Sequence, residues 1–232
     1  MIHSYLESLI MECLLQIKGE RTVYSVFHLI TGKKSSQTIQ DGHLFGITQY
    51  YRTYTSISRV EYDQVIASLQ ERGFIIIRKN NGEYELQNKA FEALQQYRSY
   101  FPLVSNVNGL LFHGKQQEFW KRFSLVFQVL SNSVYGNNKY YTVQRDRDVQ
   151  IWVKAFLFRQ RDRKMLSRLL YTELEKVLSK LSENHGKVFM LKVSGYHRVG
   201  YSNVQIARLL QMDESYVHYL FIDVLHYILT VA

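Results

Sequence analysis

The stretch GKKSSQT, residues 32–38, has the composition of a phosphate-binding loop, because it combines a glycine, two lysines and three hydroxyl side chains. A Walker A loop needs a glycine five residues before its Gly-Lys pair and a serine or threonine directly after that pair. Those two positions hold Phe27 and Lys34. The spacing therefore excludes a loop that wraps a triphosphate.

The same stretch fits a junction between two helices. Gly32 suits the end of one helix, and Ser35 or Ser36 suits the N-cap of the next. Free amides at a helix N-terminus attract anions. We therefore predict that Lys33, Lys34, Ser35 and Ser36 can hold one DNA phosphate, with an ordinary solvated cap as the alternative.

The chain has no residue pattern of an enzyme or a metal site. Its eight histidines are scattered and its single cysteine is Cys13, whereas a zinc site needs several such ligands at fixed spacing. No nucleophile elbow, metalloprotease motif or carboxylate pair stands out. Cys13 lies among apolar residues, so we interpret it as a small buried hydrophobe. We expect a protein that is not an enzyme and has no catalytic residue, metal or cofactor.

The formal net charge of +9 favours a polyanionic partner such as nucleic acid. Residues 1–100 are nearly balanced, with 11 basic and 10 acidic residues, whereas residues 101–232 hold 18 and 10. Between Lys139 and Arg168 there are nine basic residues and three acidic ones. A solvated surface on which opposite charges pair along a helix is the alternative to phosphate contact. The phosphate contacts predicted from this stretch are Arg145, Arg147, Arg159, Arg161, Arg163 and Lys164.

Residues 1–98 read as three or four helices followed by a β-hairpin. Apolar spacing predicts helices over residues 4–17, 22–30 and 36–51, and Ser58 with Glu61 has the spacing of a capping box that begins a fourth. The segments FIIIRK and EYELQ then flank Asn-Asn-Gly, the chemistry of a tight hairpin turn. This order is typical of a winged helix, whose wing residues Arg78 and Lys79 can touch a DNA backbone. A plain helical domain with an added hairpin is the alternative.

Residues 99–117 lack periodicity and are predicted to connect two domains. Residues 118–135 are apolar on more than one side, which predicts a helix in the middle of its domain. Two further helices are predicted over residues 149–158 and 166–181, and residues 187–193 fit either a helix or a strand. The predicted fold is mainly α, with a winged-helix-like domain over residues 1–98 and a helical domain over residues 118–232 that ends in a helix-turn-helix at about residues 202–228.

The helix-turn-helix spacing lies in SNVQIARLLQMDESYVHYLFIDVL. Ala207 permits two helices to approach, Met212 fills the turn, and Asp213 suits the N-cap of the second helix. Gln211 stands where a turn glycine is usual, so it must adopt a left-handed conformation. No lysine or arginine follows Leu209, and the acids Asp213, Glu214 and Asp223 would repel phosphate. We therefore predict a partner-binding face rather than a base-reading one, formed by Tyr216, His218 and Tyr219.

Length and hydropathy place broad limits on the protein. A chain of 232 residues can form two domains with separate cores. The apolar runs are far shorter than a membrane span, and the N-terminus lacks the apolar region of a signal peptide. We expect a soluble, cytoplasmic protein without a membrane partner. The apolar ending VLHYILTVA fits either a buried terminus or a fragment of a longer protein.

Four blocks carry a resemblance to a known family: KGERTVYSVFHLITGKKSSQTIQDGHLFG, EFWKRFSLVFQVLSN, YTVQRDRDVQIWVKAFL and SGYHRVGYSNVQIARLL. Together they resemble the YpbB-like helix-turn-helix proteins of Gram-positive bacteria, which are encoded beside a RecQ-type DNA helicase. The resemblance implies an accessory or DNA-targeting role for that helicase. It also implies a further C-terminal helix-turn-helix module, which these 232 residues do not include.

Three functional hypotheses follow from the sequence. The first is a non-catalytic partner of a RecQ-type helicase that binds the helicase through a helical face and DNA phosphates through the basic stretch, without strong sequence preference. The second is a transcription regulator that reads an operator through a helix-turn-helix. The third is an adaptor that does not contact DNA.

Overall fold

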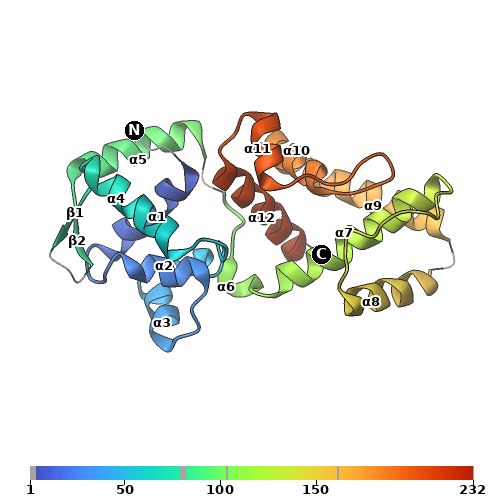
Figure 1. Ribbon diagram of the computed structural model, residues 1–232, viewed down its shortest axis with the longest axis horizontal. Coiled ribbons are helices and arrows are strands. Elements are labelled where there is room, and N and C mark those ends of the chain that lie inside the picture. Colours follow the sequence, from blue (N-terminus) through green and yellow to red (C-terminus); the bar gives the residue numbers. More distant parts are fainter. Residues whose placement is uncertain (1–3, 79–81, 103, 161, 232) are drawn as a thin grey trace. The chain divides into compact units, whose positions relative to one another are not determined.

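The computed structural model describes residues 4–78, 82–102, 104–160 and 162–231. The chain divides into two compact units, Met1–His113 and Gly114–Ala232. In the part of the chain that is described, the only strands are the two of one antiparallel hairpin, and the other regular elements are helical (Figure 1). The predicted mainly α class with a hairpin is therefore confirmed, whereas the winged-helix assignment remains a prediction.

The first unit holds four helices, a hairpin and two further helices. In chain order these are α1 (Tyr5–Ile17), α2 (Tyr24–Thr31), α3 (Ser36–Leu44), the 3-10 turn η1 (Thr48–Tyr50), α4 (Arg59–Glu71), β1 (Ile75–Arg78), β2 (Glu83–Leu86), α5 (Asn88–Tyr100) and α6 (Gly109–Phe112). The capping box predicted at Ser58 and Glu61 is present and begins α4. The hairpin register pairs Ile75 with Leu86 and Arg78 with Glu83. Asn80 and Asn81, which were predicted to form its turn, lie outside the described residues.

α1 lies at the centre of the first unit. The predicted amphipathic stripe is only part of its buried surface, because Ser8 and Met11 are also covered. Cys13 is fully buried, and this burial raises the pKa of its thiol. Glu7 is buried as well, and its Oε1 lies 2.7 Å from Nη2 of Arg72, the residue that directly follows α4. A buried carboxylate needs such a partner, so this ion pair compensates for burying the charge of Glu7 on α1 next to the end of α4.

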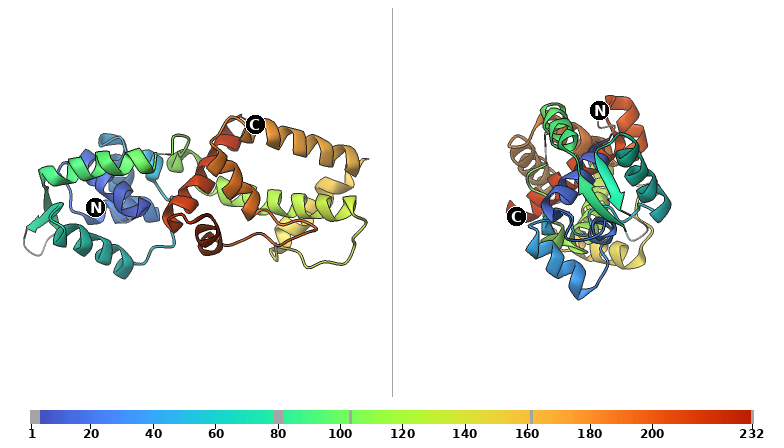
Figure 2. Two further views of the ribbon diagram at one scale, coloured as in Figure 1. Left: turned by 90° about the horizontal axis from the view of Figure 1, so that it is seen from above. Right: turned by 90° about the vertical axis from the view of Figure 1, so that its left-hand side faces the viewer.

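The second unit is built on α7 (Lys115–Val134). Both α8 (Arg147–Phe158) and α9 (Arg163–Leu178) pack against α7 (Figures 1 and 2). The chain continues through α10 (Glu183–Lys192) and α11 (Asn203–Leu210) to α12 (Glu214–Val231), which packs against α7, α10 and α11. The position of α7 matches the prediction that residues 118–135 form a middle helix. Residues 187–193, for which helix and strand were both open, belong largely to α10.

The structure places helices in two segments where the sequence predicted none. α5 follows the hairpin directly and buries Ala90, Leu94 and Tyr97. Residues 99–117, predicted as a connector, include the end of α5, the whole of α6 and the start of α7. α6 packs against η1, with Gly109 placed against the backbone of Tyr51. The boundary between the two compact units lies at His113 and Gly114.

Candidate nucleic-acid interface

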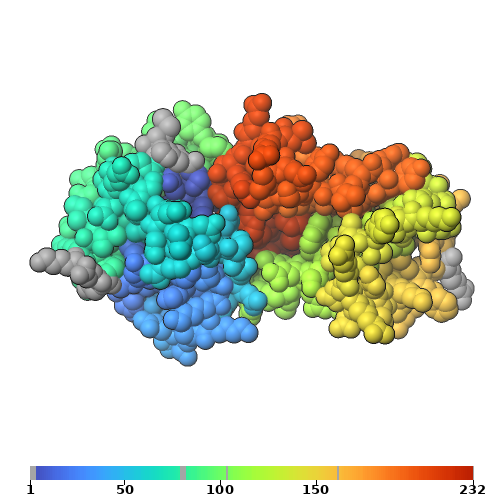
Figure 3. All heavy atoms as spheres, viewed as in Figure 1, coloured from blue at the N-terminus to red at the C-terminus, as the bar shows by residue number. Residues whose placement is uncertain are grey.

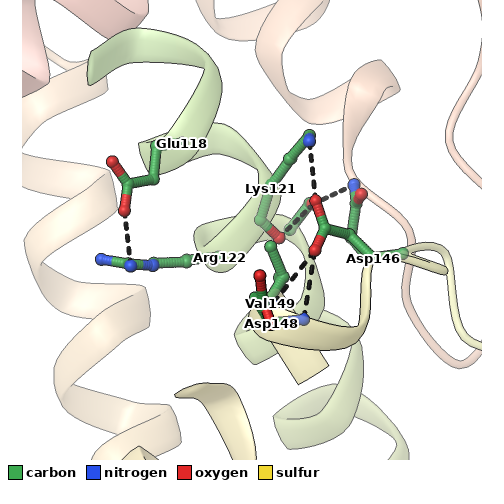
Figure 4. Close-up of polar contacts among 8 residues, drawn as sticks. Glu118, Lys121, Arg122, Asp146, Asp148 and Val149 are labelled. Carbon is green, nitrogen blue, oxygen red and sulfur yellow. Dashed lines mark hydrogen bonds and ion pairs between the residues drawn. The ribbon is translucent and has the colours of Figure 1, made fainter. Parts of the chain in front are cut away.

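The start of α8 is fixed by Asp146, which lies inside the basic stretch. Its Oδ1 accepts hydrogen bonds from the backbone N–H groups of Asp148 and Val149 at 3.2 and 3.4 Å. Its Oδ2 accepts one from Lys121 Nζ of α7 at 2.9 Å (Figure 4). These bonds, with that from Lys121 the largest contribution, lower the pKa of Asp146. The carboxylate thus caps α8 and joins it to α7, so it is not paired with the neighbouring arginines.

Asp162 has the same role at the start of α9. Its Oδ1 accepts hydrogen bonds from the N–H groups of Lys164 and Met165 at 2.8 and 2.9 Å. A carboxylate at a helix N-terminus also interacts favourably with the helix dipole. Two of the three acids in the basic stretch are therefore engaged at helix ends.

Seven basic side chains between Arg145 and Arg168 lie in the described part of the chain, and all seven are exposed. Within the described residues none of the seven forms an ion pair with a carboxylate. Pairing of opposite charges along the helix, the alternative left open by the sequence, does not occur at these positions. The seven are Arg145, Arg147, Lys154, Arg159, Arg163, Lys164 and Arg168, whereas the predicted Arg161 lies outside the described residues.

Four of the seven cations follow the helical repeat. Arg147 and Lys154 are seven residues apart and share one exposed face of α8. The atoms of α8, shown in yellow in Figure 3, lie at the surface of the second unit. Lys164 and Arg168 are four residues apart and share a face of α9. Lys154 was not among the predicted phosphate contacts, although its seven-residue spacing from Arg147 indicates that both lie on one face of a helix. We name the seven residues the basic arm.

The junction predicted at GKKSSQT is confirmed. Gly32 ends α2 in the left-handed conformation, with φ of 80°, and Ser35 caps α3 by accepting the Thr38 N–H at 3.2 Å. Lys33, Lys34 and Ser36 are exposed. A polar cavity of about 200 Å³ lies beside this helix start. It already contains the carboxylate of Asp41, which pairs with Arg21 at 2.9 Å. Phosphate binding here therefore remains a prediction, carried by the two exposed lysines.

The hairpin offers less free charge than the sequence indicated. The Arg78 guanidinium contacts Glu85 Oε2 at 2.8 Å, and both side chains are exposed. A phosphate would have to compete with this carboxylate for Arg78. The alternation in EYELQ could have predicted this ion pair, because it places Glu83 and Glu85 on the same face of β2, where they can meet a basic residue of β1. Lys79, the other predicted wing contact, lies outside the described residues.

α11 and α12 are joined by the local geometry that the sequence predicted. Gln211 adopts the left-handed conformation with φ of 52°, although it is not glycine. The Met212 N–H donates to the carbonyl of Ala207 at 2.9 Å, and Asp213 Oδ1 accepts the Tyr216 N–H at 2.8 Å. Tyr216 and Tyr219 are only 6% and 0% exposed, and His218 is half-buried. In this conformation neither tyrosine offers a face to a partner.

The expectation that Asp223 presents a negative charge to phosphate is wrong. Its side chain is 1% exposed, and its Oδ2 lies 3.1 Å from Nε2 of His185 on α10. Asp213 is engaged as a cap, so of the three acids only Glu214 is exposed. Burial therefore leaves few side chains of α12 that could reach a base, and of the three acids only Glu214 remains at the surface.

His226 is buried near Asp223, and it gives the stability of the second unit a predictable dependence on pH. Its ring is 0% exposed and contacts the side-chain oxygen of Gln116. Burial lowers its pKa from 6.5 to about 4, although the nearby Asp223 acts in the opposite direction. Between pH 6.5 and 4 the unfolded chain therefore binds more protons than the folded one.

We expect the free energy of unfolding of the second unit to fall by about 2–3 kcal/mol as the pH is lowered from 6.5 to 4. Urea unfolding followed by tryptophan fluorescence measures this unit selectively, because Trp120 and Trp152 are the only tryptophans of the chain. His226→Gln should reduce the slope, and His197→Gln, at an exposed histidine, should not. An equal slope in wild type and His226→Gln would contradict the assignment.

Within the described residues, no helix is long and apolar enough to cross a membrane. The same part of the chain holds no group of three His, Cys, Asp or Glu side chains that could bind a metal.

No protein-family model matches this chain, and no solved structure matches it. The chain is similar to Protein YpbB of Bacillus subtilis (strain 168), with 31% identity over 224 residues. The similar region covers 97% of this chain and 64% of that protein, so the chain spans just under two thirds of its relative. This similarity supports the YpbB-like resemblance indicated by the four sequence blocks.

Proposed function

We propose that this YpbB-like chain is a non-catalytic, DNA-binding partner of a RecQ-type helicase. The observation that carries the DNA-binding part is the basic arm, whose seven exposed cations form no ion pair among the described residues. Lysine and arginine side chains of this kind contact phosphates irrespective of base sequence. The helicase part rests on the family resemblance. The two roles are separable, because one concerns charge and the other a protein surface.

The burial of α12 supports backbone binding over operator recognition. A recognition helix must insert exposed side chains into the major groove, but eleven of the eighteen residues of α12 are buried. The exposed lysines at the start of α3 can add phosphate contacts in the other unit. We therefore expect affinity for DNA that depends on salt more than on sequence.

DNA binding is tested by fluorescence anisotropy with two labelled duplexes of unrelated sequence at increasing NaCl. We expect the logarithm of the association constant to fall against the logarithm of salt concentration with a slope of about −3 to −6, and equally for both duplexes. A preference of roughly 10³-fold for one sequence would instead favour a transcription regulator. Absence of binding at low salt would favour an adaptor without DNA contact.

The helicase association is tested by a pull-down with the immobilised chain and a purified RecQ-type helicase from the same organism. We expect retention of the helicase before and after nuclease treatment, because the contact is between proteins rather than through shared DNA. Retention that disappears after nuclease treatment, or no retention at all, would contradict the proposed partnership.

A further inference from the structure

An apolar groove of about 370 Å³ lies between α7, α8 and α9 of the second unit. Its walls are predominantly aromatic, and they come from all three helices: Phe119, Phe123, Val126, Trp152, Phe156 and Leu170. Concave sites with apolar walls and a few polar groups at the edge are the usual form of a binding pocket. The basic arm does not account for this groove, because the arm consists of exposed charges.

The walls of the groove hold each other in place. The rings of Trp152 and Phe156 stack with centroids 5.3 Å apart and planes 5° from parallel. The Arg122 guanidinium lies 4.6 Å from the Trp152 ring centroid, and its Nη2 contacts Glu118 Oε1 at 2.5 Å (Figure 4 shows the Arg122–Glu118 pair). Trp152 is still 38% exposed. The groove is therefore a formed, accessible apolar site rather than a gap that a ligand would have to open.

Charge around the groove indicates the kind of ligand. Lys115, Glu118 and Arg122 lie at its rim, where Glu118 and Arg122 neutralise each other and Lys115 has no carboxylate partner among the described residues. Arg159 lies seven residues after Trp152, and Arg163 lies seven residues before Leu170, so each continues the helical stripe of a wall residue. Both arginines are exposed and, like the rest of the basic arm, have no carboxylate partner among the described residues. Asp148, four residues before Trp152, is the opposing exposed charge on the α8 stripe.

These observations favour a peptide over a nucleobase. Phe156 and Arg122 already contact the ring of Trp152, so less of that ring is available for stacking with a base. A nucleobase also needs partners for its polar edge, whereas six of the nine wall and rim residues are apolar. An aromatic or aliphatic side chain satisfies the apolar walls, and acidic neighbours satisfy the cationic surroundings.

We propose that this groove docks a short acidic segment of a partner protein by enclosing one of its aromatic or long aliphatic side chains. The inference does not depend on the proposed helicase partnership or on DNA binding. It assigns the groove to a protein ligand and the outward face of α8, with Arg147 and Lys154, to phosphate.

The two tryptophans of the chain give an internal control for a direct test. With 5-fluorotryptophan incorporated into the protein, Trp152 reports the groove, whereas Trp120 reports the internal cluster in which it lies 4.7 Å from the Phe221 ring. The probe is a synthetic peptide with one phenylalanine and one leucine flanked by aspartates and glutamates. We expect the fluorine-19 resonance of Trp152 to shift on titration and that of Trp120 to stay in place. A peptide with lysines in place of the acids should leave both resonances unshifted.

Anisotropy of the fluorescein-labelled acidic peptide then measures affinity in variants. Trp152→Ala should weaken binding by about tenfold or more, the effect of losing one buried aromatic contact. The matched control is Phe158→Ala, because Phe158 lies on the same helix, is 88% exposed and does not line the groove. Arg159→Glu with Arg163→Glu should weaken peptide binding without disturbing the apolar walls, which keeps the test valid if Trp152→Ala does not fold.

Three results would overturn this proposal. The first is no shift of the Trp152 resonance with the acidic peptide. The second is a shift with oligothymidylate instead, which would assign the groove to single-stranded DNA. The third is an equal loss of affinity in Trp152→Ala and Phe158→Ala. Because Trp152→Ala should leave salt-dependent DNA binding unchanged, failure here is distinguishable from failure of the proposed function.

Discussion

Reversing the charges of Arg147 and Lys154 together is expected to weaken DNA binding by roughly 10- to 100-fold at low salt, through the loss of two phosphate contacts and their counterion release. Both side chains are exposed on one face of α8, and neither has a carboxylate partner among the described residues. The salt slope should become shallower by about 2, since each phosphate contact contributes about 0.9. Anisotropy with a labelled duplex over a range of NaCl concentrations measures both quantities.

The double variant should fold normally. Arg147 is the first residue of α8, where glutamate interacts more favourably with the helix dipole than arginine does. Lys154 lies on the exposed face, where lysine and glutamate have similar helix propensities. Loss of DNA binding can therefore be assigned to the surface charge, provided that circular dichroism and thermal unfolding match those of the wild type.

A matched control separates local contact from net charge. Lys176→Glu with Lys180→Glu makes the same change in total charge on exposed positions of the same unit, outside the basic arm. We expect it to reduce affinity by no more than about threefold, because charges beyond a Debye length are largely screened. An equal loss in both double variants would mean that net charge alone attracts DNA and that α8 is not the interface.

Gly200→Ala is expected to destabilise the second unit by about 1–3 kcal/mol, the usual range for forcing an additional carbon atom into a packed site. Gly200 lies in the segment between α10 and α11, against the end of α10. An alanine Cβ would overlap the carbonyl oxygen of Lys192 and lie 2.7 Å from its carbonyl carbon. The neighbouring contacts are backbone too, since the Tyr201 N–H donates to the carbonyl of Leu191 at 2.9 Å. Neither of these two backbone segments can move apart without breaking the hydrogen bond that joins the end of α10 to the segment before α11.

A second glycine of the same unit, Gly186, should give a more stable protein when it is replaced by alanine. Gly186 lies inside α10, and a Cβ there meets nothing within 4 Å. Gly186→Ala should stabilise the unit by about 0.5–1 kcal/mol, because alanine is the better helix former and restricts the unfolded chain. Urea unfolding followed by tryptophan fluorescence compares both variants with the wild type. If Gly200→Ala proved as stable as the wild type, the close approach to Lys192 would be wrong.

The sequence by itself determined the features that depend on residues a few positions apart. Examples are the capping box at Ser58 and Glu61, the left-handed ends at Gly32 and Gln211, and the N-cap at Asp213. Each is set by one side chain or one φ angle that acts on backbone groups of the next turn. α5 was predictable in the same way, because Ala90, Leu94 and Tyr97 have helical spacing, although no helix was expected after the hairpin.

Only the tertiary structure decided which of these groups remain available for binding. Arg78 is paired with Glu85 across the hairpin, so a phosphate would have to compete for it, and Asp223 is buried beside His185 rather than exposed. The apolar groove depends on Arg122 meeting Trp152 from another helix. Burial and ion pairing arise between residues that are distant in the sequence, and therefore a composition that predicts a basic surface cannot predict which of its charges are free. Packing left the basic arm exposed, with no carboxylate partner in the described part of the chain, and it covered most of α12.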